Sequence, residues 1–283
     1  MLVTNTLGNG WILPGDDAAI TAAADLLRGC QIVAVPTETV YGLAADASNA
    51  DAVAHIYAAK GRPDFNPLIV HVPDKAAAER LAVFDELADR LASAFWPGPM
   101  TLVLPLRAGA TVTKAVTAGL PTIAIRCPAH PVMQSVLAKT GLNLAAPSAN
   151  KSGGISPTRA EHVLASLGGA VPLILDAGPC AAGLESTIVA VRENGWQILR
   201  PGPLTADAIE AIAGSAAISV SDEKIEAPGQ LASHYAPSKP VRLNATAAES
   251  DEWLIGFGAV SGDENLSASG DLAQAAAHLF DAL

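Results

Sequence analysis

The sequence predicts an α/β fold built of layers of helices and a sheet. Short apolar runs typical of buried strands alternate with segments whose apolar residues recur at helical spacing. Half of the 283 residues are hydrophobic, enough for a large core, but only 4% are aromatic, so alanine and the aliphatic residues form that core. With only 16% charged residues, the chain is too apolar to be disordered.

The helices are predicted from their capping residues and their apolar stripes. Asp16 or Asp17 can cap a first helix that ends at Gly29. Asn49 can cap a second helix that runs to Gly61. Further helices are expected over residues 85–95, 131–139, 158–167 and 205–213.

The strands are predicted from short apolar runs bounded by glycine, proline and polar residues. They lie between the helices without a strict alternation, so the sheet need not be wholly parallel. The expected strands cover residues 31–35, 68–72, 100–106, 122–126, 142–146, 171–175, 186–191 and 196–199.

The chain is predicted to contain two domains joined by a linker. Residues 221–240 show neither the helical nor the strand periodicity of apolar residues. They contain three prolines and a glycine, which is typical of a linker. The expected division is a first domain over 1–220, the linker, and a second α/β unit over 241–283. At roughly 40 residues, this unit is near the size below which a domain rarely folds alone. Its elements are expected over 241–243, 253–260 and, as a helix, 271–283.

Composition excludes several classes of function. The chain has 28 acidic and 17 basic residues and a net charge of −11. Because such a surface repels a phosphate backbone, the chain is not expected to bind nucleic acid by itself. No apolar run is long enough to span a membrane, and the N-terminus lacks the features of a secretory signal. The three cysteines are far apart, which predicts neither disulfides nor a paired zinc site. We therefore expect a cytoplasmic protein.

No familiar phosphate-binding or hydrolase motif is present in the sequence. There is no Gly-Lys-Ser/Thr, no His-Glu-x-x-His and no Gly-x-Ser-x-Gly, and Gly8-x-Gly10 lacks both the third glycine and a preceding strand. If ATP is used, its site is not one of the familiar loops.

Thr37 is the first candidate site residue, because it follows a predicted buried strand and Pro36. Ligands of open α/β sheets bind beside such strand ends, where a hydroxyl can donate and accept hydrogen bonds. The alternative is a turn in which the hydroxyl satisfies the local backbone. The heptad PTETVYG leaves both interpretations open.

Lys60 and Arg62 stand together at the end of the second predicted helix. In a chain with only 17 basic residues, two within three positions suit a polyphosphate, lysine as a point charge and arginine as a fork. The alternative is that both complement the negative end of the helix dipole. The local sequence does not decide between these interpretations.

His71 and Arg126 both belong to apolar strands. A histidine in such a strand is more often a core residue than a catalytic one. A guanidinium at the end of a buried strand needs a carboxylate, supplied by the protein or by a ligand.

Small polar side chains follow other predicted strands. Ser148 and Asn150 offer hydrogen bonds without bulk, and Ser156 leads into a helix whose free N–H groups favour an anion. The alternative is a Ser/Asn turn that caps this helix. Ser186 and Arg200 lie at two further strand ends.

Taken together, up to four cations accompany serine and threonine hydroxyls. The sequence suggests no cage of His and Cys and no nucleophile with its base. The pattern predicts a pocket that positions a phosphorylated ligand and catalyses mostly by neutralising charge. The cations are Lys60, Arg62, Arg126 and Arg200.

Seven strings in a fixed order resemble the Sua5/YciO/YrdC family. They are PTETVYGL, KGRPDFNPLIVHV, FWPGPMTLVL, TIAIRCPAH, APSAN, ESTI and LRPGP, and the later APGQLASHYAP resembles the linker of Sua5-type members. The resemblance covers about residues 12–240, with the motifs of the catalytic domain within 12–205. The set is specific, although each string alone is not.

The resemblance implies a YrdC-like catalytic domain, in which helices flank a twisted mixed sheet, and a nucleotidyltransferase activity. Such enzymes form L-threonylcarbamoyladenylate and pyrophosphate from L-threonine, bicarbonate and ATP. Partner proteins then use this product for t6A modification of ANN-decoding tRNAs, so strong direct tRNA binding is not expected. Mg²⁺ is expected to arrive with ATP rather than on fixed protein ligands.

The resemblance also assigns roles to particular residues. Tyr235 in the linker is expected to close over the nucleotide. L-Threonine is expected to contact Thr37, His71, Arg126, Ala146 and Ser186, whereas ATP is expected to contact Lys60, Arg62, Asn66, Thr122, Ser148, Asn150, Ser156, Arg200 and Tyr235.

The second unit departs from the family pattern, because Sua5-type members carry a full Rossmann-like domain after the linker. We therefore expect a shortened Rossmann-like unit over 241–283. Two alternatives share the catalytic-domain fold: a non-catalytic nucleotide- or RNA-binding module, and a domain of hydrogenase-maturation type that handles carbamoyl-adenylate. The charge of −11 argues against the first alternative. Acylphosphatase and zinc-finger segments accompany a domain of the second kind, and this sequence shows neither.

Overall fold

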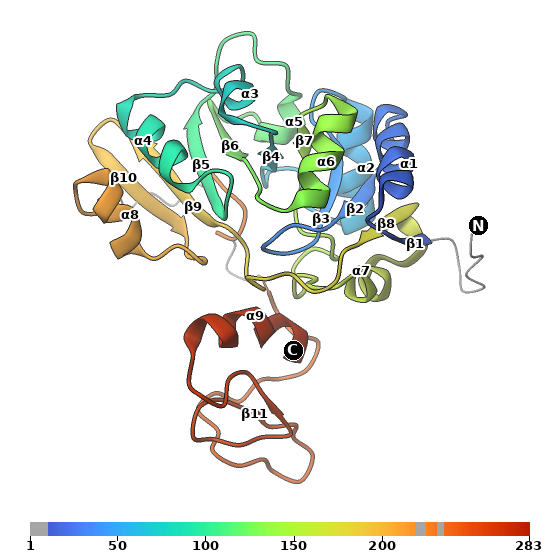
Figure 1. Ribbon diagram of the computed structural model, residues 1–283, viewed down its shortest axis with the longest axis vertical. Coiled ribbons are helices and arrows are strands. Elements are labelled where there is room, and N and C mark those ends of the chain that lie inside the picture. The colour runs from blue at the N-terminus through green and yellow to red at the C-terminus, as the bar shows by residue number, and fades with distance from the viewer. Residues whose placement is uncertain (1–10, 219–224, 231–234) are drawn as a thin grey trace.

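A ten-stranded mixed sheet forms the centre of the first domain in a computed structural model, which describes residues 11–218, 225–230 and 235–283 (Figure 1). The strand order is β1-β8-β2-β3-β7-β4-β6-β5-β9-β10. The strands are β1 (Trp11–Pro14), β2 (Val33–Val35), β3 (Gly42–Asp46), β4 (Ile69–His71), β5 (Met100–Pro105), β6 (Thr122–Arg126), β7 (Leu144–Ala145), β8 (Leu173–Asp176), β9 (Thr187–Arg192) and β10 (Gly195–Arg200).

Helices cover both faces of this sheet. Val33 and Val35 of β2 pack with α1 and α6, whereas the intervening Ala34 faces the larger core that includes α2, α4, α7 and α8. The helices of the first domain are α1 (Asp17–Arg28), α2 (Ala50–Lys60), α3 (Lys75–Glu79), α4 (Glu86–Phe95), α5 (Lys114–Thr117), α6 (Pro131–Thr140), α7 (Ala160–Leu167) and α8 (Ala206–Ala213), with a 3-10 turn at Gly168–Ala170.

The predicted caps of the first two helices are confirmed. The Asp16 carboxylate accepts a hydrogen bond from the Ala19 amide at the start of α1, and the Asn49 side chain accepts from the first amides of α2. Such side chains satisfy amides that have no partner inside the helix. Gly61 ends α2 in the left-handed conformation (φ 59°), which glycine adopts without strain.

Four elements of the first domain were not expected from the sequence. Strand β1 contains a proline and lies at an edge of the sheet, while β3 has the sequence GLAAD, without β-branched or aromatic residues. Helices α3 and α5 have only five and four residues, too short to show a helical period. The remaining predicted strands and helices occur, with shifted ends.

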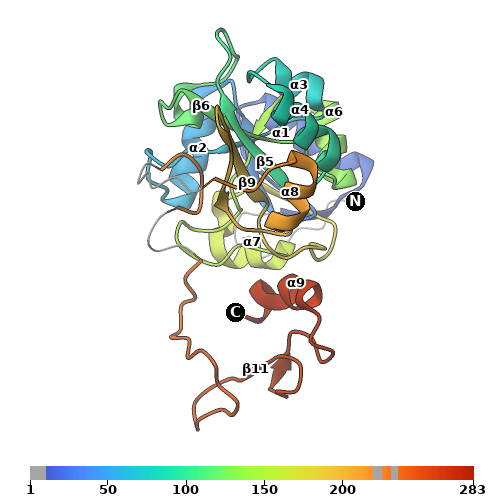
Figure 2. The same ribbon diagram turned by 90° about the vertical axis from the view of Figure 1, so that its left-hand side faces the viewer.

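The C-terminal unit has little regular structure. Two residues each of β11 (Ile255–Gly256) and β12 (Glu264–Asn265) form a parallel pair, followed by α9 (Leu272–Ala282). The expected strand at 241–243 was wrong, since these residues have no strand pairing. Figure 2 shows this unit below the first domain, with α9 under α7.

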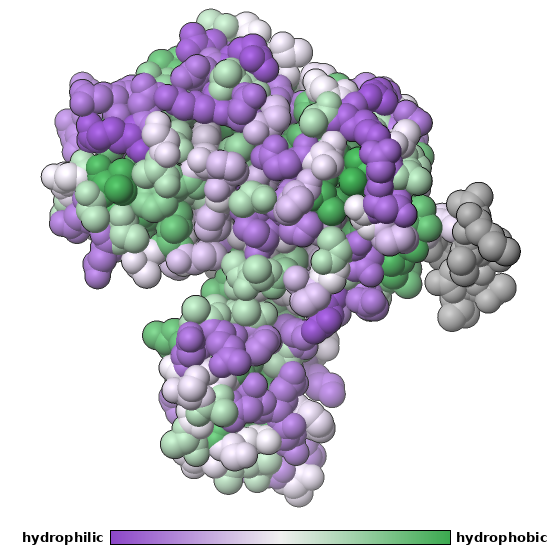
Figure 3. Space-filling view, viewed as in Figure 1, coloured by the Kyte–Doolittle hydropathy of each residue, from purple (hydrophilic) through white to green (hydrophobic). Residues whose placement is uncertain are grey.

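The two units are joined through the stretch expected as a linker. Of residues 221–240, those at 225–230 and 235–240 are described and contain no helix or strand, while 221–224 and 231–234 lie outside the described residues. On the face shown in Figure 3, the surface where the two units meet consists mainly of weakly hydrophobic residues. Within the described part of the chain, no helix is long and apolar enough to cross a membrane.

Candidate active site

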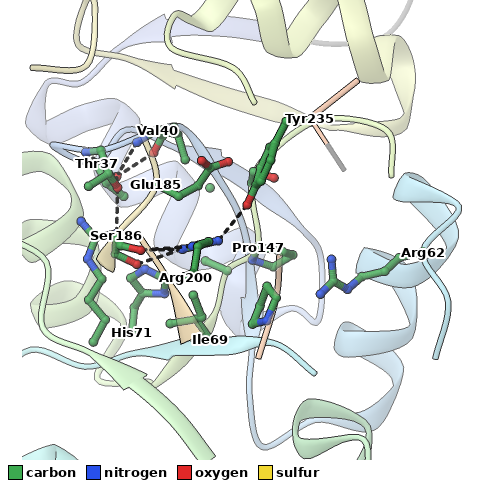
Figure 4. A pocket seen from close by; sticks show the side chains of 16 residues that line it. Thr37, Val40, Arg62, Ile69, His71, Pro147, Glu185, Ser186, Arg200 and Tyr235 are labelled. Carbon is green, nitrogen blue, oxygen red and sulfur yellow. Dashed lines mark hydrogen bonds between the residues drawn. The ribbon is translucent and has the colours of Figure 1, made fainter. Parts of the chain in front are cut away.

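The ends of several strands converge on one pocket, shown in Figure 4. His71 at the end of β4 is the register partner of Arg126 at the end of the parallel β6. β7 lies beside β4, and the Ala146 amide donates to the Ile69 carbonyl (3.0 Å). Because β10 runs antiparallel to β9, Arg200 at its end lies next to the start of β9. Sheet pairing therefore brings together residues that are far apart in the sequence.

Arg126 is held on three sides by the protein. Its Nε donates to the Gly98 carbonyl (3.2 Å) and its Nη1 to the Thr39 hydroxyl (2.7 Å). Its Nη2 lies 2.6 Å from the Glu38 carboxylate. Burial favours the neutral form of Glu38, but the Arg126 charge outweighs it and holds the Glu38 pKa below its usual value. The carboxylate that Arg126 was expected to need is thus supplied by the protein.

Lys60 and Arg62 bind neighbouring loops rather than the end of α2. The Lys60 ammonium donates to the carbonyls of Ser148 and Asn150. Arg62 donates from Nε to the Asn66 carbonyl (3.2 Å) and from Nη2 to the Pro67 carbonyl (2.8 Å). The helix-dipole interpretation does not account for these contacts. Both cations instead fix the loops that border the pocket.

Burial lowers the pKa of both groups. It lowers the pKa of Lys60 to about 7, with a further decrease from the Arg62 charge and a partial offset from Glu185. Burial likewise lowers the Arg62 pKa to about 10. A bound polyphosphate would stabilise the protonated form of Lys60 at neutral pH.

His71 is a buried, neutral imidazole that reaches the pocket. Burial, followed by the nearby Arg126 charge, lowers its pKa to about 3. Its Nδ1 is buried without a hydrogen-bond partner among the described residues. At neutral pH, His71 therefore offers a hydrogen bond to a ligand, not a positive charge.

Arg200 links three parts of the site. Its Nε and Nη2 donate to the Ser186 carbonyl (3.1 and 3.0 Å), and Nη2 also donates to the Ser186 hydroxyl (3.1 Å). Its Nη1 donates to the Tyr235 hydroxyl (3.2 Å). The Ser156 hydroxyl donates to the buried Glu185 carboxylate nearby. The motifs ESTI and LRPGP and the linker thus meet in one network.

Thr37 forms a local turn and also lies at the pocket. Its hydroxyl donates to the Val40 carbonyl (2.6 Å) and accepts from the amides of Thr39 and Val40 (3.1 and 3.2 Å), as expected of a turn. It also lines the pocket.

Nine of the fourteen predicted site residues line the pocket directly. Lys60, Asn150 and Ser156 lie behind it, attached to lining residues or their loops. Asn66 is fully buried with both side-chain polar atoms unpartnered among the described residues. Thr122 begins β6, at the opposite end from Arg126. The nine are Thr37, Arg62, His71, Arg126, Ala146, Ser148, Ser186, Arg200 and Tyr235.

Sequence reasoning assigned no role to two acidic residues of the site. Glu38 pairs with Arg126, and Glu185 is the carboxylate among the residues that line the pocket. Both lie within strings that carry the family resemblance, PTETVYGL and ESTI. An acidic residue at a strand end, in a chain whose cations gather at the other strand ends, was the available signal.

A buried pocket with three guanidinium groups, one carboxylate and several hydroxyls at the strand ends of a mixed sheet defines a class of protein. It fits an enzyme that binds a phosphorylated nucleotide together with a small polar substrate. It provides positioning and charge neutralisation rather than a nucleophile with its base.

Comparisons with known proteins give the family. The Sua5_yciO_yrdC family, described as telomere recombination, matches residues 25–202, and the C-terminal domain of threonylcarbamoyl-AMP synthase matches residues 204–283. The chain belongs to the Sua5/YciO/YrdC family and, within it, to the Sua5-type threonylcarbamoyl-AMP synthases, which are nucleotidyltransferases of t6A biosynthesis.

Curated relatives from distant organisms support this placement. The threonylcarbamoyl-AMP synthase of Bacillus subtilis is 46% identical over 248 residues, which are 86% of this chain and 71% of the relative. That of Pyrococcus abyssi is 43% identical over 78% of this chain and 66% of the relative. The chain thus spans about two thirds of the length of these relatives.

Solved structures support the fold. Sua5 of P. abyssi complexed with L-threonine superimposes with a TM-score of 0.85 at 37% identity, over 98% of this chain and 88% of that one. YciO of Escherichia coli (TM-score 0.62, 19% identity, 72% of this chain and all of that one) shares the fold alone. The predicted YrdC-like sheet followed by a Sua5 C-terminal domain is confirmed.

Proposed function

We propose that the pocket holds L-threonine at one side and the ATP phosphates at the other. Three guanidinium groups around one pocket are the observation that carries this proposal. In Figure 4, Thr37, Ser186 and His71 lie at one side, Arg62 lies at the other, and Arg200 lies between them. Threonine would bind beside Arg126 and His71, and the triphosphate would lie between Arg62 and Arg200.

The threonine side suits an amino acid. Arg126 would bind the carboxylate, although it already faces Glu38, so two carboxylates would share one guanidinium. Thr37, His71 and Ser186 offer hydrogen bonds, and Ala146 leaves room for a small side chain. Sua5 of P. abyssi has been solved in complex with L-threonine, which supports threonine as the small substrate of this pocket.

The ATP side would combine charge and shape. Lys60, Arg62 and Arg200 supply positive charge, while Ser148, Asn150 and Ser156 supply small polar groups in nearby loops. Asn66 and Asn150 have buried polar atoms without partners among the described residues. Asn66, Asn150 and Thr122 keep their predicted role as proposals.

The reaction needs positioning more than acid–base groups. The amine of threonine, once deprotonated, takes up bicarbonate to form an N–C bond with loss of water. An oxygen of the resulting carbamate attacks the α-phosphorus of ATP, and the bond to the β-phosphate breaks, releasing pyrophosphate. The arginines and Lys60 offset the negative charge gathered in this step.

Magnesium fits the pocket as a companion of ATP. Glu185 is a hard oxygen donor that lines the pocket, and Mg²⁺ in nucleotide enzymes is commonly held by one or two carboxylates and the phosphates. Among the described residues, no group of three or more His, Cys, Asp or Glu could hold a metal. Bound with ATP, Mg²⁺ would neutralise phosphate charge.

The product would pass to the machinery that transfers the threonylcarbamoyl group to tRNA. The net charge of −11 supports a role in which this chain does not hold the tRNA strongly. We further propose the division into a catalytic domain over 1–220, a linker over 221–240 and a C-terminal unit over 241–283.

Pyrophosphate release from ATP tests the proposed reaction. Purified protein is assayed with threonine and bicarbonate each omitted in turn, and the adenylate is identified by mass spectrometry. We expect release that requires both co-substrates. Release in the absence of both would show an unspecific ATPase and contradict the proposal, as would a failure to release pyrophosphate from bound ATP.

Tyr235→Ala is expected to raise the KM for ATP about tenfold. Its hydroxyl accepts from Arg200, and its ring lines the pocket, so its loss opens the nucleotide side. Steady-state kinetics with ATP varied at saturating threonine measures the effect. An unchanged KM for ATP would remove Tyr235 from the nucleotide site.

A further inference from the structure

The end of α9 contacts the linker beside the pocket. The Phe280 ring stacks on Tyr235, with centroids 5.8 Å apart and planes 24° from parallel. Phe280 is 9% exposed, so this contact is largely shielded from water. The ring that forms part of the pocket wall is thus packed from behind by a residue of the C-terminal unit.

A second set of contacts fixes α9 against α7. The Arg159 Nε donates to both oxygens of the Asp281 carboxylate (3.0 and 3.1 Å). The His162 Nε2 lies 3.2 Å from the same carboxylate. Arg159 and His162 belong to the first domain, at the start of α7 and within it. Asp281, directly after Phe280, therefore anchors the segment that carries the stacked ring.

Gly183 allows the backbone of α9 to approach closely. A Cβ atom at this position would lie 2.4 Å from the Ala277 carbonyl oxygen and 2.5 Å from its Cα. Gly183 is also in the left-handed region (φ 67°), which favours glycine. It stands two residues before Glu185, in the loop that enters the site, so α9 packs on the same loop that supplies site residues.

Tyr235 itself has an unfavourable backbone conformation. Its φ is 57°, in the left-handed region, where an aromatic residue persists only if its surroundings hold it. The adjacent Ala236 amide donates to the Gly153 carbonyl (2.9 Å), and the Tyr235 hydroxyl accepts from Arg200. The stack with Phe280 adds a further restraint on the ring.

We propose that Phe280 is a positioning residue for the nucleotide side of the site, and that Asp281 holds it in place through Arg159 and His162. The contacts run from Phe280 to Tyr235, from Tyr235 to Arg200, and from Arg200 to Ser186. The C-terminal unit thereby sets the affinity for ATP without contacting it. This inference rests on the proposed function, because it requires Tyr235 to act at the nucleotide.

Phe280→Ala is expected to raise the KM for ATP about three- to tenfold, because the variant loses the stacking of one aromatic pair. The kcat and the KM for threonine are expected to stay within about twofold. Phe280→Tyr keeps the aromatic ring, so its KM for ATP is expected to equal that of the wild-type protein. Asp281→Asn is expected to change the KM for ATP in the same direction as Phe280→Ala. Leu272→Ala, at the other end of α9 and 77% exposed, is the matched control and leaves all constants unchanged.

The combination with Tyr235→Ala separates positioning from general damage. If Phe280 acts through Tyr235, then Phe280→Ala has no further effect on the KM for ATP in the Tyr235→Ala background. Independent, multiplying effects would overturn the proposal, and so would an unchanged KM in Phe280→Ala alone. Circular dichroism melting of each variant checks that the fold is kept.

Calorimetric titration with a non-hydrolysable ATP analogue distinguishes a failure of the proposed function from a failure of the positioning role of Phe280. If wild-type protein does not release pyrophosphate, the proposed function fails, yet the analogue still reports whether Phe280→Ala weakens nucleotide binding. If wild-type protein is active and the variant binds the analogue with unchanged affinity, the positioning role fails alone.

Discussion

Replacing Arg126 with alanine is expected to abolish threonine binding while ATP still binds. The guanidinium is buried at the end of β6 and lines the pocket, so its removal leaves a bound carboxylate without a charged partner. Truncating one member of a buried, hydrogen-bonded charge pair costs about 2–5 kcal/mol, which corresponds to a loss of affinity of roughly 30- to 4,000-fold. Isothermal titration calorimetry with each ligand separately measures it.

Glu38 complicates this experiment, and a paired variant resolves it. Arg126→Ala leaves the Glu38 carboxylate buried without its cation, a change that destabilises proteins by about 3–5 kcal/mol. The double variant Arg126→Gln with Glu38→Gln removes both charges together and preserves the polar contacts better. It is expected to fold, to bind ATP, and not to bind threonine. Retained threonine affinity in this double variant would refute the role of Arg126.

Lys60→Met is expected to lower the rate of adenylate formation about 100- to 1,000-fold. Removing one preorganised charge-stabilising group from an active site typically has an effect of this size. Lys60 also ties together the loops of Ser148 and Asn150, so part of the loss comes from their displacement. Single-turnover measurement of threonylcarbamoyladenylate gives the rate. A change of less than about fivefold would contradict a direct role at the phosphates.

The same lysine predicts a proton uptake linked to ATP binding. In the folded protein without ligand its pKa is lowered to about 7, against roughly 10.4 in an unfolded chain. Between these values the unfolded chain binds more protons, so the free energy of unfolding rises with pH across this window. Bound phosphates raise the pKa again, and at pH 8 binding takes up close to one proton.

Calorimetry in two buffers with different ionisation heats measures this uptake at pH 8. The apparent binding enthalpy of wild-type protein is expected to depend on the buffer more strongly than that of Lys60→Met. The difference between the two proteins removes any contribution from the nucleotide itself. Equal buffer dependence in both proteins would show that Lys60 does not change its protonation.

The regular elements were predictable where one signal dominated. α1 and α2 have an acidic or amide cap, an apolar stripe and a glycine stop, and both were found with the expected caps. β3 could not be found this way, because Gly42–Asp46 owes its extended form to pairing with β2 and β7 rather than to its own propensity. The order of strands was equally hidden, since it depends on which edges pair.

The site was predictable as a set of residues but not as a geometry. Cations and hydroxyls at strand ends pointed to a phosphorylated ligand, and nine of fourteen residues line one pocket. The pairing of Arg126 with Glu38 was not visible, because Arg126 ends β6 whereas Glu38 lies in the loop between β2 and β3. The stack of Phe280 on Tyr235 joins residues 45 positions apart across a linker without periodicity, so no local pattern announces it.

The order of strands along the chain has a consequence for synthesis. Ser186 and Arg200 flank β9 and β10, the last two strands of the large sheet, and β10 forms its outer edge. During synthesis, most core-forming residues of this domain therefore leave the ribosome before the residues that complete the pocket. Neither ATP nor threonine can therefore template the early collapse of this domain, because the pocket is complete only after Ser186, Arg200 and Tyr235 have been synthesised.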